Sequence, residues 1–322
     1  MRRLLAVTLG LLGLLLVLGL VLPEWIVFLL TVALAKGIVV LSVVLLMHAG
    51  LVSFGQGLFF ATGAYAVGFA MKLWGVREAT AVAGLGVAAS IAVAALAGLL
   101  VARYREIFFA MLSLAFSMIL YGLLVKAYWI TGGTDGLRIT SPTILGIAPS
   151  AERLRLALYV FTLACTAVTV YLIYRYLDSP LGYTVRAIRD NEVRVEYLGT
   201  SVQRTIYLTY LLAGGLGGLG GVLVALNIGH IDPNLAYWTT SGEFVFVALL
   251  GGTASVFAPL GGAIIYELIR TYAAKYSPYT WQMILGVIML AIILFMPGGL
   301  WTIYEASARR MRGWRLSLKR SA

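Results

Sequence analysis

The segment Asp178–Arg204, DSPLGYTVRAIRDNEVRVEYLGTSVQR, is a charged island between two apolar runs at residues 156–177 and 206–229. Much of the remaining sequence is apolar enough to lie in lipid. The 322-residue chain is 61% hydrophobic and 11% charged, whereas soluble domains are charged at about a quarter of their positions. An amphipathic insert of this kind predicts a platform for a soluble partner.

The apolar runs themselves predict transmembrane helices. A helix needs roughly 20 apolar residues to cross about 30 Å of hydrocarbon, and long unbroken runs favour helices over the short alternating strands of a barrel. The sequence therefore predicts an all-α polytopic membrane protein of about ten transmembrane helices, in a single transmembrane domain over residues 1–322. The runs lie near residues 4–22, 25–47, 57–74, 81–102, 107–128, 156–177, 206–229, 241–256, 259–274 and 280–297.

The N-terminus and the basic residues indicate the orientation. The apolar run after Met1-Arg2-Arg3 is longer than the about 7–15 residues of a signal-peptide core, which favours a retained first helix over a cleaved signal peptide. A cytoplasmic N-terminus would place 15 of the 24 Lys and Arg in cytoplasmic segments and 8 outside, as the positive-inside rule requires. We therefore expect both termini, the loop 178–205 and the basic tail 303–322 in the cytoplasm, with the tail suited to lipid headgroups.

Signals for catalysis and cofactors are nearly absent. His48 and His230 lie far apart at span ends, and without ligand spacings they predict no metal site. No catalytic residue is predicted, and the net charge of +11 is ascribed to cytoplasmic loops rather than to nucleic-acid binding. Since the chain has no G-x-x-x-x-G-K-[ST] loop for phosphates, any ATP that drives it must bind another subunit.

Two other patterns have competing interpretations. Residues 215–220 match G-x-G-x-x-G, but without a preceding strand the pattern does not predict a dinucleotide site. The pairs Gly214/Gly218 and Gly217/Gly221 instead favour close helix packing. Charges inside the spans suggest function because burying them is costly, and local pairing is the alternative; these are Lys36, Glu243 and Glu267, the last with Arg270 on the same helix face.

Glycine-rich interruptions occur at Gly50–Gly57 and Gly251–Gly262. Uncharged polar residues among glycines at membrane depth favour broken or re-entrant helices around a watery cavity. Paired interruptions in the two halves of a chain indicate a translocation path between two inverted repeats. Ordinary tight turns are the alternative.

The charged island is predicted to form one helix. Ser179 and Pro180 are a suitable start and Gly199 a suitable end. Mixed charges favour docking in a protein groove over lying on anionic lipid. The apolar residues that recur with helical spacing are Leu181, Val185, Ile188, Val195 and Leu198.

The island closely resembles the cytoplasmic loop of LivM-type permeases of bacterial branched-chain amino acid ABC transporters. Four further segments are similar to that family, and together with the island they occur in the same order as in the family. These segments are Gly50–Gly68, Gly132–Leu137, Leu249–Ala263 and Phe295–Trp301. The resemblance implies a multi-pass import permease of the bacterial cytoplasmic (inner) membrane. It also implies a LivH-like second permease, two cytoplasmic ATPases that hold ATP and Mg, and a periplasmic or extracellular binding protein.

By the same resemblance, the loop 178–205 couples the permease to an ATPase. The residues it assigns to this coupling are Ser179, Pro180, Arg186, Ala187, Arg189, Asp190, Asn191, Glu192 and Gly199. The residues that we expect to line the path are Ser53, Gln56, Gly57, Thr253 and Ser255. An ion-coupled secondary transporter of a small polar solute is the alternative function, and related permeases also serve urea, amides and aromatic acids.

Overall fold

The computed structural model describes residues 2–144, 146–296 and 298–302, so the predicted basic tail lies outside the described residues. These residues form 12 α-helices, two short 3-10 helices, η1 (Gly133–Asp135) and η2 (Pro233–Ala236), and a small antiparallel ladder of β1 (Leu137–Arg138) with β2 (His230–Ile231). The helices are α1 (Arg2–Val21), α2 (Glu24–Met47), α3 (Gln56–Trp74), α4 (Ala79–Val101), α5 (Glu106–Lys126), α6 (Tyr128–Thr131), α7 (Ala151–Leu177), α8 (Pro180–Tyr197), α9 (Val202–Ile228), α10 (Trp238–Gly251), α11 (Ala258–Tyr276) and α12 (Trp281–Phe295).

Each predicted apolar run coincides with one of these helices, and the two helices outside the runs are α6 and α8. Five helices, α2, α4, α5, α7 and α9, are long and apolar enough to cross a membrane by length and composition. The predicted all-helical, multi-pass class is confirmed by these helices and by the family match reported below.

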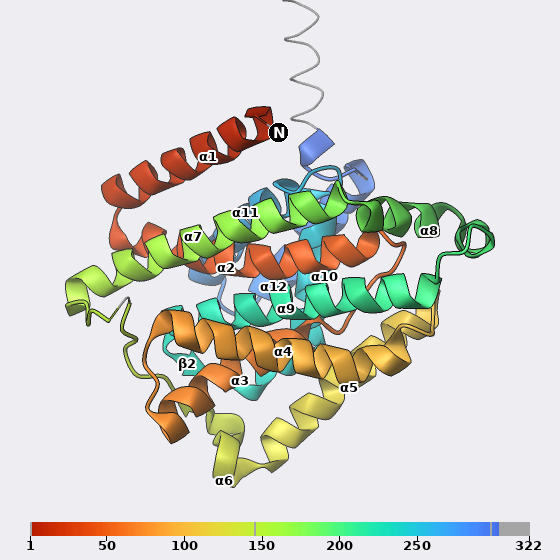
Figure 1. Ribbon diagram of the computed structural model, residues 1–322. Coiled ribbons are helices and arrows are strands. Elements are labelled where there is room, and N and C mark those ends of the chain that lie inside the picture. Colours follow the sequence, from red (N-terminus) through yellow and green to blue (C-terminus); the bar gives the residue numbers. More distant parts are fainter. Residues whose placement is uncertain (1, 145, 297, 303–322) are drawn as a thin grey trace, which may run out of the picture.

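The long helices pack side by side and leave their connections at two ends of a bundle (Figure 1). We call the end that contains α8 the α8 end. The α2–α3 connection lies at this end, since Gly50 packs against Arg189 of α8. The α4–α5 turn belongs to the same end, since Arg105 pairs with Glu192. The opposite end, here the ladder end, contains η1 and the β1–β2 ladder, with α6 beside them.

Helix α9 is the centre of the packing and lies against α2, α3 and α4. Its glycines allow this, because a side chain there would overlap a neighbouring helix. A methyl group on Gly221 would collide with the carbonyl of Phe60 in α3, and one on Gly220 would meet Val39 of α2. The packing interpretation of the glycines is confirmed.

The second glycine-rich interruption, Gly251–Gly262, forms the short turn between α10 and α11. Helix α10 has 14 residues, a rise of about 21 Å, which is shorter than the roughly 30 Å of a hydrocarbon core. Gly252 ends it with a φ of 91°, a conformation that favours glycine. Because α10 is short, the α10–α11 turn lies beside a cavity that the end of α2 and the base of α8 also line.

Candidate functional site

Helix α8 begins and ends where its sequence predicts. The Oγ of Ser179 accepts a hydrogen bond from the Gly182 N–H at 3.3 Å, and Pro180 takes the first helical position. At the other end Gly199 has a φ of 83°. The N–H of Gly199 donates to the Glu196 carbonyl at 2.9 Å and that of Thr200 to the Val195 carbonyl at 3.3 Å. These two bonds form the Schellman arrangement, which completes a helix C-terminus.

Asn191 divides α8 into two helices, which the sequence does not predict. Its backbone is extended, with φ −165° and ψ 101°, inside an otherwise helical segment. The Asn191 Oδ1 accepts a hydrogen bond from the Arg194 N–H at 2.9 Å, as an N-cap residue does at the start of a helix. The loop is thus an elbow of two short helices rather than one rod.

The predicted apolar face of α8 is only partly correct. Val185, Ile188 and Val195 are buried against the ends of α2, α4, α5 and α9. Leu181 and Leu198 are instead 41% and 79% exposed. Two causes explain this: Gly182 packs tightly on the last carbonyls of α7 and so points its neighbour outward, and Leu198 follows the last helical residue and so leaves the helical period.

Several polar contacts attach α8 to the bundle. The Arg186 guanidinium donates to the Leu177 carbonyl of α7 at 2.7 Å and lies over the Tyr183 ring. The Arg105 Nε donates to the Glu192 Oε2 at 2.8 Å. Arg105, which the sequence did not single out, also donates to two carbonyls in the α4–α5 turn, so it ties the second half of α8 to the start of α5.

Most of the predicted coupling residues are exposed to a partner, although some of them also bond the bundle or α8 itself. Arg186, Ala187, Arg189, Asp190 and Asn191 are exposed. Other exposed residues of the same loop are large and apolar or aromatic: Leu181, Tyr183, Val193, Tyr197 and Leu198. Apolar groups within a rim of both charges are typical of the core and edge of a protein interface.

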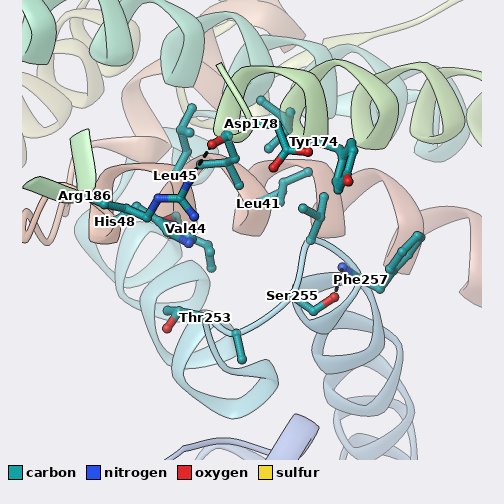
Figure 2. Close-up of a pocket in the computed structure, with 14 residues that line it drawn as sticks. Leu41, Val44, Leu45, His48, Tyr174, Asp178, Arg186, Thr253, Ser255 and Phe257 are labelled. Carbon is teal, nitrogen blue, oxygen red and sulfur yellow. Dashed lines mark hydrogen bonds between the residues drawn. The ribbon is translucent and has the colours of Figure 1, made fainter. Parts of the chain in front are cut away.

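A cavity of about 220 Å³ lies at the base of α8, between the ends of α2 and α7 and the α10–α11 turn (Figure 2). Asp178 and Arg186 line it from the α8 side, and Thr253 and Ser255 from the turn. The Ser255 hydroxyl accepts a bond from the Phe257 N–H at 3.3 Å. Two of the five predicted path residues therefore share one cavity.

The other three predicted path residues lie inside the packed bundle. Ser53 and Gln56 are fully buried. The Gln56 Oε1 accepts from the Ser42 Oγ at 3.0 Å, and the Gly57 N–H donates to the Ser241 Oγ at 2.9 Å. Ser53, Gln56 and Gly57 therefore do not share the cavity that Thr253 and Ser255 line.

Helices α2, α10 and α11 bring the charges inside the predicted spans together into one cluster. The Lys36 Nζ is 2.8 Å from the Glu243 Oε1 and also contacts Glu267. Arg270 lies 3.5 Å from Glu243 and 3.6 Å from Glu267. Two positive and two negative groups compensate one another, so the local-pairing interpretation is the one that the structure favours.

The apolar helices and the compensated charges within them define a multi-pass membrane protein with a structured loop at one end. Among the described residues we identify no cluster of catalytic side chains. The chain belongs to the family of branched-chain amino acid transport system permease components, whose profile matches residues 25–293. Members of this family are transport components, in agreement with the prediction of a non-catalytic permease.

Individual relatives agree with this assignment. The chain is 27% identical over 274 residues to the high-affinity branched-chain amino acid transport system permease protein LivM of Escherichia coli, covering 78% of this chain and 64% of that protein. A probable LivM of Methanocaldococcus jannaschii is 26% identical, with 79% and 86% covered. The LivH permease of Escherichia coli is 22% identical, with 55% and 53% covered. No solved structure matches the chain.

Proposed function

We propose that this chain is a membrane-spanning subunit of an ABC importer that moves branched-chain or related amino acids inward. The observation that carries the proposal is α8, a capped elbow whose exposed apolar residues and charges suit a partner's groove. The energy would come from ATP hydrolysed with Mg on two cytoplasmic partner subunits. Ser179, Pro180 and Gly199 would shape the loop, and the residues from Arg186 to Glu192 would contact the ATPase.

The topology belongs to this proposal as well. Ten helices would cross the bacterial cytoplasmic membrane, in two inverted repeats, with the α8 end and both termini in the cytoplasm. Residues 1–322 would form one permease domain, with the coupling loop at 178–205 and a basic cytoplasmic tail at 303–322. The partners would be a LivH-like permease, two ATPases, a periplasmic or extracellular binding protein and membrane lipid.

Movement of α8 can reach the bundle through its contacts with other helices. Arg186 is bonded to the end of α7 and Glu192 to Arg105 at the start of α5. A shift of α8 upon closure of the ATPases would therefore displace both helices. Thr253 and Ser255 line the cavity that this motion would alter, and we retain them, with Ser53, Gln56 and Gly57, as proposed path residues.

Reconstitution tests the proposal. We expect ATP-dependent uptake of L-leucine in proteoliposomes that contain the chain with its partner subunits, and none with the chain alone. The double reversal Arg189→Glu/Asp190→Arg should remove co-purification of the ATPase and abolish uptake. Arg153→Glu, an exposed reversal at the ladder end, is the matched control. Uptake by the chain alone, or full assembly of the double variant, would refute the coupling role of α8.

A further inference from the structure

The cavity at the base of α8 combines opposite charges that do not neutralise each other. Asp178, the C-cap of α7, and Arg186 of α8 both line it (Figure 2). Among the described residues no ion pair joins the two side chains. One N–H of Arg186 bonds the Leu177 carbonyl, and the guanidinium has five such donors. The Asp178 carboxylate accepts a hydrogen bond from the Tyr174 hydroxyl and keeps further acceptor sites. The cation and the anion therefore each have hydrogen-bonding capacity left on the same cavity.

The remaining surface of the cavity is mostly aliphatic, with two hydroxyls and the rings of His48, Tyr174 and Phe257. Aliphatic side chains, among them Leu45 and Ile173, come from α2 and α7, and the hydroxyls of Thr253 and Ser255 come from the turn. At about 30 Å³ for each water molecule, its volume of about 220 Å³ holds roughly seven waters. This is space for one small solute, below the roughly 300 Å³ at which drug-sized sites begin.

We propose, on the basis of the proposed function, that this cavity binds one free aliphatic amino acid as its zwitterion from the cytoplasmic side. The carboxylate of the amino acid would bond the Arg186 guanidinium, its ammonium group the Asp178 carboxylate, and its side chain would pack on the aliphatic wall. The opposed charges disfavour a simple anion, which Asp178 repels, and a simple cation, which Arg186 repels.

Binding at this place would regulate the importer. An occupant touches α8 on one side and the α10–α11 turn on the other, so it favours one position of α8 over others. A ligand that holds α8 in one position opposes its movement by the ATPase. Amino acid that accumulates in the cytoplasm would thus slow its own import, a coupling between two sites of one protein.

Equilibrium binding to the purified full chain in nanodiscs, with radiolabelled L-leucine as probe, tests the site. We expect saturable binding that N-acetyl-L-leucine and L-leucinamide each compete for about tenfold less well than unlabelled L-leucine, because each lacks one charged group. Asp178→Asn should lose the discrimination against N-acetyl-L-leucine alone, and Arg186→Gln that against L-leucinamide alone.

Two further variants separate binding from folding. Thr253→Trp fills the cavity without altering either charge and should abolish leucine binding, whereas Arg194→Gln changes an exposed arginine outside the cavity and should not. Thermal melting identifies any variant that fails to fold. If Arg186→Gln is unfolded, the binding results with Thr253→Trp, Asp178→Asn and the two leucine derivatives decide whether the cavity binds leucine.

Clear outcomes contradict the inference. Absence of saturable binding up to about 10 mM leucine, roughly tenfold above the upper end of usual metabolite affinities, would overturn it, as would binding that survives Thr253→Trp. Binding that depends on phosphatidylethanolamine in the nanodisc would assign the cavity to a lipid headgroup instead. ATP-driven uptake by the complete complex is measured separately. Uptake without leucine binding would support the proposed importer and refute the cytoplasmic site, whereas leucine binding without uptake would support the site and refute the importer.

Discussion

Burial and nearby charges change the protonation of His48 at the α8 end. His48 follows the last residue of α2, and its Nδ1 lies 2.8 Å from the Val44 carbonyl. Burial is the largest cause that lowers the pKa of His48 below 6.5; the hydrogen bond to the Val44 carbonyl opposes this shift, and the charges of Arg186 and Arg189 add to it. His48 lines the cavity at the base of α8 together with Asp178. The native protein therefore favours neutral His48.

This lowered pKa predicts how stability depends on pH. Between the native pKa and about 6.5, the unfolded chain binds a proton at His48 that the native protein does not. Stability should therefore be complete above pH 6.5 and fall as the pH decreases below it. Melting curves from pH 5 to 8 should show a weaker decrease for His48→Gln than for the unchanged protein. Equal slopes for both proteins would contradict the role of His48.

The charge cluster around Lys36 yields a second prediction. Lys36→Met leaves two buried carboxylates with Arg270 alone, and removing one partner of a buried pair costs about 3–5 kcal/mol. Lys36→Met/Glu267→Gln restores neutrality and should recover part of the loss, as thermal or denaturant unfolding in detergent would show. Arg155→Gln breaks the exposed pair with Glu24 and should cost about 0–1 kcal/mol. A double variant less stable than Lys36→Met would show that the charges do not compensate.

Among the helices, α9 depends most on small residues. A methyl group on Gly221 would overlap the Phe60 carbonyl in α3, whereas one on Gly122 of α5 would meet no atom within 4 Å. Gly221→Ala should therefore destabilise the protein by about 1–3 kcal/mol through overpacking. Gly122→Ala should be neutral or stabilising, because alanine favours helix over glycine by about 1 kcal/mol. Equal melting temperatures of the two variants would contradict the close approach of α9 and α3.

The elements show what the sequence can and cannot predict. The bounds of α8 were predictable, because Ser179, Pro180 and Gly199 act on their immediate neighbours. The elbow at Asn191 and the exposure of Leu198 were not, since both depend on how the loop is seated on other helices. The cluster of Lys36 with Glu243 joins residues 207 positions apart, and only the packing of α2 against α10 reveals it.

For the whole molecule, the sidedness of the two ends decides whether an ATPase can reach α8. In a Cys165→Ala background, the substitutions Leu198→Cys and Trp129→Cys each introduce the single thiol at a side chain 79% or 93% exposed. A membrane-impermeant maleimide should label Leu198→Cys in inverted vesicles and not in spheroplasts. It should label Trp129→Cys, near the ladder end, in spheroplasts only.

The labelling pattern separates the functional alternatives, because it fixes the compartment from which α8 can be moved. A cytoplasmic α8 is accessible to ATPases, whose nucleotide is also cytoplasmic, and the cavity at its base then opens toward imported solute. Positive residues at the α8 end, including Arg103, Arg186 and Arg194, favour this side by the positive-inside rule. Labelling of Leu198→Cys in spheroplasts would place α8 outside, and neither the coupling role of the loop nor the cytoplasmic amino-acid site would then be tenable.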